Sequence, residues 1–126
     1  MNWKKSIAVA LSAVTIMAMV AGCGSNTATN DQKKIGVIQL VEHPSLDAAN
    51  KGFVDGLASK GYKDGQNIKL DQQNAQADQS NLNSIAQRFV SDKIDLVLAI
   101  ATPAAQTMAN ASHDMPIMGT AITDYV

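Results

Sequence analysis

The fold is decided by the stretch from Ile35 to Asp47, which reads Ile-Gly-Val-Ile-Gln-Leu-Val-Glu-His-Pro-Ser-Leu-Asp. It begins as a short apolar run with β-branched side chains, which is typical of a strand buried on both faces of a parallel sheet. The run turns polar at Glu42, Pro44 ends the strand, and Ser45 can cap the helix that follows. Because ligands bind at the carboxyl ends of strands in open α/β sheets, we expect Val41–Asp47 to form the first wall of a binding site.

An amphipathic helix is predicted after this loop, over residues 45–60. Its apolar positions fall on a single stripe, which consists of Leu46, Ala49, Phe53 and Leu57. Gly61 is well placed to end the helix in the left-handed conformation. Gly52 and Gly56 each weaken a helix by about 1 kcal/mol relative to Ala, and the expected compensation is a close approach of the helix to the sheet.

The alternation of strand and helix continues along the chain. Residues 66–74 predict a second, less buried strand, residues 94–100 another apolar strand, and residues 116–119 a short fourth strand. The helix between the second and third strands starts at Asp78 or Ser80 and has the strongest amphipathic pattern in the chain. The order βαβαβαβ predicts an α/β fold with a doubly wound parallel sheet and right-handed crossovers.

Polar residues follow three of these strands. If the first, third and fourth strands are neighbours, as the flavodoxin-like order places them, the polar clusters share one edge of the sheet. Hydroxyls and free N–H groups at helix starts attract anions, and carboxylates suit an ammonium group, so the set suits a zwitterion such as an amino acid. The residues are Glu42, His43, Ser45 and Asp47 after the first strand, Thr102 after the third, and Thr120, Thr123 and Asp124 after the fourth.

Each of these residues has a second interpretation that the sequence leaves open. Ser45 and Thr102 can be plain helix caps, Thr102 with Pro103 at the first helical position. Asp47 can serve the helix dipole alone, and His43 can be a solvated loop residue.

Catalytic and cofactor motifs are absent from the sequence. Ser45 lacks a Gly-x-Ser-x-Gly frame, and Glu42 and His43 have no paired acid at a recognisable spacing. Glycine-rich phosphate loops and Cys/His metal spacing are also missing. We therefore expect a binding protein without catalytic residues, metal or cofactor. The alternative is a surface-tethered α/β enzyme acting on a small polar substrate, with Glu42 or His43 as base.

The first 22 residues have the pattern of a secretory signal. Lys4 and Lys5 precede an apolar run from Ile7 to Val20, which is shorter than the roughly 20 residues of a membrane-spanning helix. The run leads into Val-Ala-Gly-Cys, ending at Cys23, which resembles a bacterial lipobox, in which the cysteine is lipidated and becomes the new N-terminus. A signal anchor and a free thiol are the alternatives.

Length and charge limit the remaining classes. The chain has 126 residues, enough for one small domain at roughly 100–200 residues per domain. Loss of Lys4 and Lys5 with residues 1–22 takes the formal net charge from −1 to −3. This acidity, without a basic cluster, argues against nucleic acid as a partner. Residues 23–34 predict a flexible tether between the lipid and the fold, and residues 35–126 form the α/β part.

Four stretches of the chain resemble one known family. They are the stretch at 35–47 quoted above, Gln-Asn-Ala-Gln-Ala-Asp-Gln-Ser-Asn-Leu at 73–82, Ala-Ile-Ala-Thr-Pro-Ala-Ala-Gln at 99–106 and Thr-Ala-Ile-Thr-Asp at 120–124. In these motifs and their order the chain is similar to the ABC-transporter solute-binding lipoproteins of the tryptophan/tyrosine-binding type. That family has the type I periplasmic-binding-protein fold, and the resemblance covers nearly all of the chain after Cys23.

The resemblance implies two α/β lobes joined by a hinge, of which this chain is a partial N-terminal lobe. The loops at Val41–Asp47, Ala101–Ala104 and Thr120–Asp124 would line the cleft, which adds Ala101, Pro103 and Ala104 to the site. The implied protein captures an amino-acid-like solute, aromatic by resemblance, and delivers it to an ABC permease. It is exported and held by a lipid at the outer face of the bacterial cytoplasmic membrane, or in the periplasm. A ligand-sensing domain of a receptor is a further alternative.

Overall fold

The computed structural model describes residues 32–123 of the chain. Within this range the predicted order βαβαβαβ is confirmed. Cys23 and Asp124 lie outside the described residues, and so do the signal sequence and most of the tether. The elements are β1 (Lys33–Gln39), α1 (Pro44–Ser59), β2 (Ile68–Asn74), α2 (Gln79–Ser91), β3 (Leu96–Ile100), α3 (Thr102–Ala111) and β4 (Ile117–Thr120).

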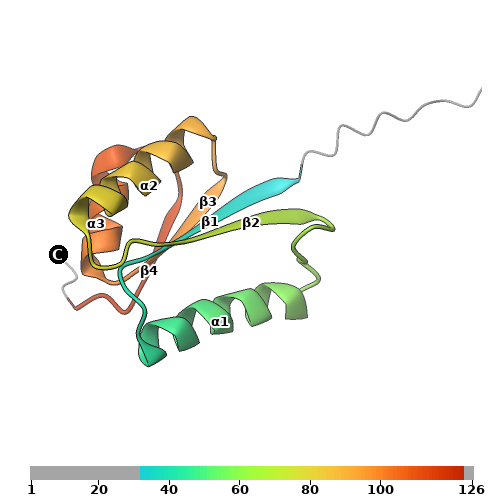
Figure 1. Cartoon of the computed structure of the whole chain (residues 1–126). Helices are drawn as coiled ribbons and strands as arrows, with labels where there is room; N and C mark the ends of the chain where they lie inside the picture. The colour runs from blue at the N-terminus through green and yellow to red at the C-terminus, as the bar shows by residue number, and fades with distance from the viewer. Residues whose placement is uncertain (1–31, 124–126) are drawn as a thin grey trace, which may run out of the picture. The chain divides into compact units, whose positions relative to one another are not determined.

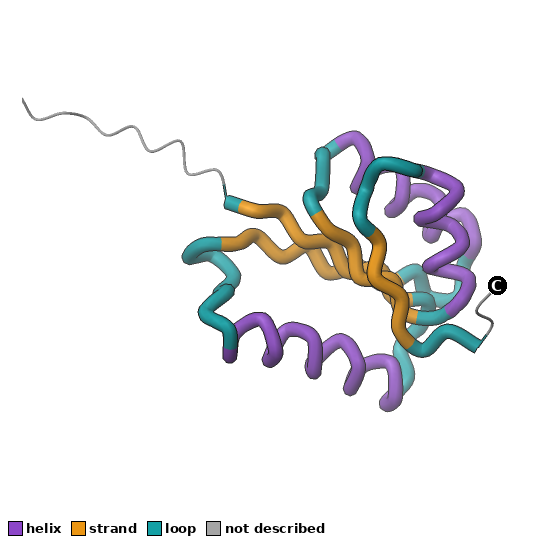
Figure 2. Tube along the Cα trace, turned by 180° about the vertical axis from the view of Figure 1, so that it is seen from behind, coloured by secondary structure: helices purple, strands orange, loops and turns teal. Residues whose placement is uncertain are grey.

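The four described strands form one parallel sheet in the order β2-β1-β3-β4. Figure 1 shows α1 on one face of this sheet and α2 and α3 on the other, and the view from behind in Figure 2 agrees. The expected doubly wound arrangement is therefore confirmed, and β1, β3 and β4 are neighbours. None of the helices among residues 32–123 is both long enough and apolar enough to cross a membrane.

The best-packed face of the sheet lies under α2 and α3. Ile38 and Val97 from the two central strands meet Phe89 of α2 and Met108 of α3, and all four side chains are fully buried. Gly36 lies directly beneath Phe89, where a Cβ atom would be only 2.6 Å from the ring carbon Cε2. A glycine is therefore required at this position for the helix to reach the sheet.

The opposite face is covered more thinly, because α1 contains no buried residue. Leu46 and Phe53 pack only partly against Val37 and its neighbours on β3. The expected close approach at Gly52 and Gly56 is wrong: no atom lies within 4 Å of a Cβ built at either position. Both glycines are exposed and simply weaken the helix. Gly61 does follow the helix with a φ of +88°, as predicted.

The amino edge of the sheet begins earlier at β1 and later at β3 than the apolar pattern predicts. β1 reaches back to Lys33 because Lys33 and Lys34 pair with Ile68 and Lys69 of β2. β3 begins at Leu96, and the carboxylate of Asp95 before it accepts hydrogen bonds from the Lys34 backbone N–H at 2.8 Å and the Lys33 Nζ at 3.0 Å. The Lys34 N–H and the Lys33 ammonium, in that order, hold the pKa of Asp95 below its usual range.

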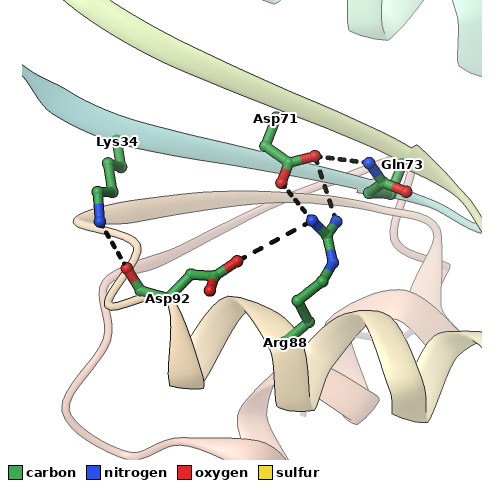
Figure 3. Close-up of polar contacts among 5 residues, drawn as sticks. All are labelled: Lys34, Asp71, Gln73, Arg88 and Asp92. Atoms are coloured by element: carbon green, nitrogen blue, oxygen red, sulfur yellow. Dashed lines mark hydrogen bonds and ion pairs between the residues drawn. The ribbon is translucent and has the colours of Figure 1, made fainter.

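A second ionic contact joins α2 to the edge strand β2. Arg88 donates to both carboxylate oxygens of Asp71, at 2.8 and 3.3 Å, and Gln73 donates to one of them at 2.6 Å (Figure 3). Partial burial alone would raise the pKa of Asp71. The hydrogen bonds from Arg88 and Gln73, together with the charges of Arg88 and Lys69, outweigh burial and hold the pKa below its usual range.

Candidate functional site

The turns after β1, β3 and β4 lie next to one another at the carboxyl edge of the sheet. The backbone N–H of Leu40 donates to the Ile100 carbonyl at 3.2 Å, and the N–H of Ala101 donates to the Thr120 carbonyl at 3.0 Å. These two hydrogen bonds continue the sheet ladder into the turns. The strand order predicted from the sequence therefore brings the three polar clusters to one edge.

The turn after β1 is built around His43 rather than Ser45. Helix α1 begins at Pro44, and the His43 side chain caps it by accepting a hydrogen bond from the Ser45 backbone N–H at 3.2 Å through Nδ1. The predicted Ser45 cap is therefore wrong, because Pro44 takes the first helical position and the cap falls at His43, two residues earlier. Glu42, His43 and Ser45 are all exposed, so their side chains can meet a ligand.

A buried amide, Gln39, holds this turn from below. Its side chain is only 3% exposed and donates to the Val41 carbonyl at 2.9 Å and to Asp47 Oδ1 at 2.6 Å. The sequence analysis did not assign Gln39 to the site. The signal was present, because Gln39 is the one amide in the otherwise apolar run from Ile35 to Val41.

The turn after β3 is strained at Ala101. This residue has a φ of +84° and a ψ of +153°, a region that is essentially restricted to glycine. Helix α3 starts at Thr102, and no side chain caps it. The predicted Thr102 cap is therefore wrong, because Thr102 is already inside the helix. Ala104 is fully buried, and Pro103 has no N–H to donate.

The Thr102 hydroxyl instead connects two turns. It accepts a hydrogen bond from the Thr123 backbone N–H at 3.0 Å, and the two threonine Oγ1 atoms lie 3.1 Å apart. Thr120 ends β4 and is half-buried, while Thr123 is exposed. Asp124, the last residue of the predicted cluster, lies outside the described residues. The structure thus brings Thr102 and Thr123 together, with the free first turn of α3 beside them.

The carboxylates of the first turn line a different hollow, between α1 and β2. Glu42 and Asp47 contribute to a pocket of about 240 Å³ whose other lining residues are Gln39, Asn50, Gln72, Gln73 and Asn74. Neither Thr102 nor Thr123 lines it. The Oδ1 atom of Asn50 is buried there without a hydrogen-bond partner among the described residues. The lining amides of β2 are its last three residues, Gln72, Gln73 and Asn74, whereas Asn50 was not singled out by the sequence analysis.

A larger pocket, of about 460 Å³, lies between α2 and α3 and is lined by residues such as Gln87 and Asn110. None of the predicted site residues lines it, so it is a groove separate from the carboxyl edge. Among residues 32–123, no group of three or more His, Cys, Asp or Glu side chains is placed to hold a metal ion. At the carboxyl edge, hydroxyls, a helix start and carboxylates offer hydrogen bonds and charge to a small polar ligand.

Comparison with known proteins identifies the family. Residues 34–126 match the family model described as "ABC transporter substrate binding protein". The chain belongs to the ABC transporter substrate binding protein family. The resemblance stated from the sequence motifs is therefore confirmed, and the proteins of this family are binding proteins.

Relatives of this substrate binding protein agree with the assignment. A tyrosine-binding protein of Clostridioides difficile is 50% identical over 134 residues, which cover 98% of this chain and 39% of the relative. A ligand-free, open substrate binding protein with adhesive properties from Clostridium difficile is 56% identical, with a TM-score of 0.72. An ABC domain in complex with L-Trp from Streptococcus pneumoniae is 50% identical, with a TM-score of 0.70.

The chain spans only part of each of these proteins. The two solved structures align with 73% and 74% of this chain but with 31% of their own lengths. The parallel sheet and helices described above therefore correspond to about a third of a substrate binding protein of known structure.

Proposed function

We propose that this chain is the partial first lobe of the capture component of an ABC importer, and that it holds an aromatic amino acid at the carboxyl edge of its sheet. The observation that carries the proposal is the meeting of the turns after β1, β3 and β4 at this edge, where Thr102 and Thr123 are hydrogen-bonded. The relatives support the choice of ligand, because one is a tyrosine-binding protein and another was solved with L-Trp.

The amino-acid carboxylate fits the turn after β3. The start of α3 has no side-chain cap, so its first-turn N–H groups and the positive end of the helix dipole are available to an anion. Thr102 and Thr123 add hydroxyls within reach of each other. The remaining members of this part of the proposed site are Ala101, Pro103, Ala104 and Thr120.

The ammonium group needs carboxylates, and two parts of the proposed site supply them. Glu42 is exposed on the turn after β1, beside His43 and Ser45. Asp124 follows Thr123 directly in the sequence. Asp47 belongs to the same turn as Glu42, but its Oδ1 already accepts a short hydrogen bond from Gln39.

In this proposal the protein binds and releases its solute without chemistry. A second α/β lobe closes over the ligand, and the closed form docks on the permease. The enzyme alternative required His43 or Glu42 as a base. His43 Nδ1 accepts the Ser45 backbone N–H, so this nitrogen is engaged in capping α1, which supports a binding role over a base role for His43.

The same proposal includes export and a lipid anchor at Cys23. The support is the lipobox-like Val-Ala-Gly-Cys after a complete secretory signal. Replacement of Cys23 by Ala should release the protein from the membrane fraction without changing its fold. Equal fractionation of both forms, with no lipid on Cys23 by mass spectrometry, would contradict the anchor.

Calorimetry on the longer, two-lobed protein that begins with this chain tests the binding function. We expect saturable binding of L-Trp or L-Tyr. Tryptamine, which lacks the carboxylate, and indole-3-propionate, which lacks the ammonium group, serve as matched controls and should each bind at least tenfold more weakly. The absence of saturable binding for every aromatic amino acid would refute the proposal.

A further inference from the structure

We infer that Gln39 is the positioning residue of the ligand-binding turn after β1. This inference rests on the proposed function, because the turn matters only if it forms a wall of the binding cleft. Gln39 is the last residue of β1, the central strand that pairs with both β2 and β3. It therefore joins a central strand of the sheet to an exposed loop.

Both N–H groups of the Gln39 side-chain amide are used. One donates to the Val41 carbonyl at 2.9 Å, two residues along the turn, and the other donates to Asp47 Oδ1 at 2.6 Å, in the first turn of α1. One buried amide thus holds the beginning and the end of the segment that contains Glu42 and His43. An aliphatic side chain could fill the same space but would leave the Val41 carbonyl and the Asp47 carboxylate without these donors.

The burial of Gln39 makes these hydrogen bonds hard to replace with water. The residue is 3% exposed, whereas the side chains that it positions, Glu42 and His43, are exposed. A buried polar group that loses its partner keeps its desolvation cost, so the native rotamer of Gln39 is strongly preferred. The exposed segment is consequently held in one conformation by the buried hydrogen bonds of Gln39 to Val41 and Asp47.

The arrangement divides the acidic residues of this turn by role. Asp47 is held by Gln39 and acts as an anchor of the turn, while Glu42 makes no such contact within residues 32–123 and can meet the solute's ammonium group. Asp47→Asn should keep the anchor, because an asparagine Oδ1 can still accept from Gln39. A ligand-contact role for Asp47 would instead make the negative charge essential.

The test compares Gln39→Glu, Asp47→Asn and the double variant Gln39→Glu/Asp47→Asn in the full 126-residue chain. Gln39→Glu places a carboxylate against Asp47 and removes the donor. The double variant restores a donor–acceptor pair in the opposite direction. Gln87→Glu, the same substitution at an exposed glutamine of α2, is the matched control.

Amide hydrogen exchange provides a readout that needs no ligand. The N–H groups of Leu46 and Asp47 both donate to the His43 carbonyl, and neither is bonded to Gln39. We expect Gln39→Glu to speed their exchange at least tenfold while Val97, in β3, is unchanged. The double variant should recover part of the protection, because the contact with residue 47 returns but the hydrogen bond to the Val41 carbonyl does not, and Gln87→Glu should alter neither exchange rate. If Gln39→Glu does not fold, Gln39→Asn, which is one carbon shorter, replaces it.

Ligand binding to the two-lobed protein is the second readout. The Gln39→Glu variant should bind L-Trp or L-Tyr at least tenfold more weakly, Asp47→Asn should stay within about threefold of wild type, and the double variant should lie between the two. Unchanged exchange at Leu46 and Asp47 in Gln39→Glu would overturn the positioning role, whatever the affinity. Faster exchange in Gln39→Glu, combined with a wild-type protein that binds no aromatic amino acid, would support the positioning role of Gln39 and refute the proposed function instead.

Discussion

The Thr102 hydroxyl accepts a hydrogen bond from the backbone N–H of Thr123 at 3.0 Å, and this bond joins the first residue of α3 to the turn after β4. The two residues are far apart in the sequence, but they lie at the turns that follow the neighbouring strands β3 and β4. Because the Thr123 N–H donates to Thr102, a conformational change in one turn should also displace the other turn.

Replacement of Thr102 by Val should uncouple these turns. The variant keeps the branched shape but loses the acceptor for the Thr123 N–H, a net loss of about 0.5–1.5 kcal/mol in the free energy of unfolding. In the two-lobed protein, the free energy of ligand binding should weaken by more than the free energy of unfolding falls. Thr102→Ser should stay close to wild type in both quantities. Denaturant unfolding and calorimetry measure the two effects. Equal affinity for the Val and Ser variants would contradict a role for this hydroxyl in the cleft.

Replacement of Gly36 by Ala should destabilise the fold. The new Cβ would lie 2.6 Å from the Phe89 ring, so the ring or the strand must move, and overpacking of this kind costs typically 1–3 kcal/mol. Gly52→Ala is the matched control, because nothing lies within 4 Å of its Cβ position. That change should stabilise the exposed helix by about 0.5–1 kcal/mol. Urea unfolding measures the change in the free energy of unfolding for both variants. If Gly36→Ala causes no loss of stability, α2 must lie farther from the sheet.

Acid should destabilise the protein through Asp71 and Asp95. Both carboxyl groups have a pKa that is held below the usual value in the folded state, so their contribution to stability is fully present above the unfolded pKa of about 3.9. It is lost as the pH falls through the lower pKa of the folded state. Arg88→Gln removes the charge that pairs with Asp71. The free energy of unfolding should therefore depend less steeply on pH in the acid range. Unfolding curves from pH 7 to pH 2 give the comparison, and identical acid dependence in both proteins would contradict the role of the Arg88 contact.

A single lobe should bind aromatic amino acids weakly. Pockets bury about 70–90% of a drug-sized ligand, but one lobe offers only one wall, and its hydrogen bonds compete with water. Association also costs several kcal/mol in lost translational and rotational freedom. We therefore expect the 126-residue chain to bind no tighter than millimolar in an NMR titration with the twenty amino acids. Self-association through the free edge of β4 should be checked in parallel. A micromolar complex of a monomeric chain would show that one wall is enough.

The sequence predicted the order of the elements better than their starting points. Strand β1 and helix α2 were recognisable because burial imposes an unbroken apolar run on one and a 3.6-residue period on the other. The start of α2 was predicted, since Asp78 is its N-cap. The start of α1 was missed because proline at the first helical position, at Pro44, makes the preceding residue the cap. At α3 the chain enters the helix through Ala101, a residue whose φ of +84° no local preference predicts.

The binding edge was predictable as a place but not as a set of contacts. Strand order follows from the alternation of elements, so the meeting of the three turns could be expected. The hydrogen bonds of Gln39 to Val41 and Asp47 depend on the orientation of one side-chain amide beneath the loop. The Thr102–Thr123 hydrogen bond depends on the register of β4. Both contacts result from tertiary packing, and the identity of a single residue does not determine them.

The central place of β1 has a consequence for how the chain folds. Its residue Ile35 pairs with Leu70 on one side and Leu96 on the other, so both neighbours of this central strand are synthesised after it. Each pairing must close a long loop before any sheet contact forms, which slows folding and lengthens the exposure of an aggregation-prone segment. In a nascent or unfolded chain, β1 is thus the segment that most needs protection from contact with other chains.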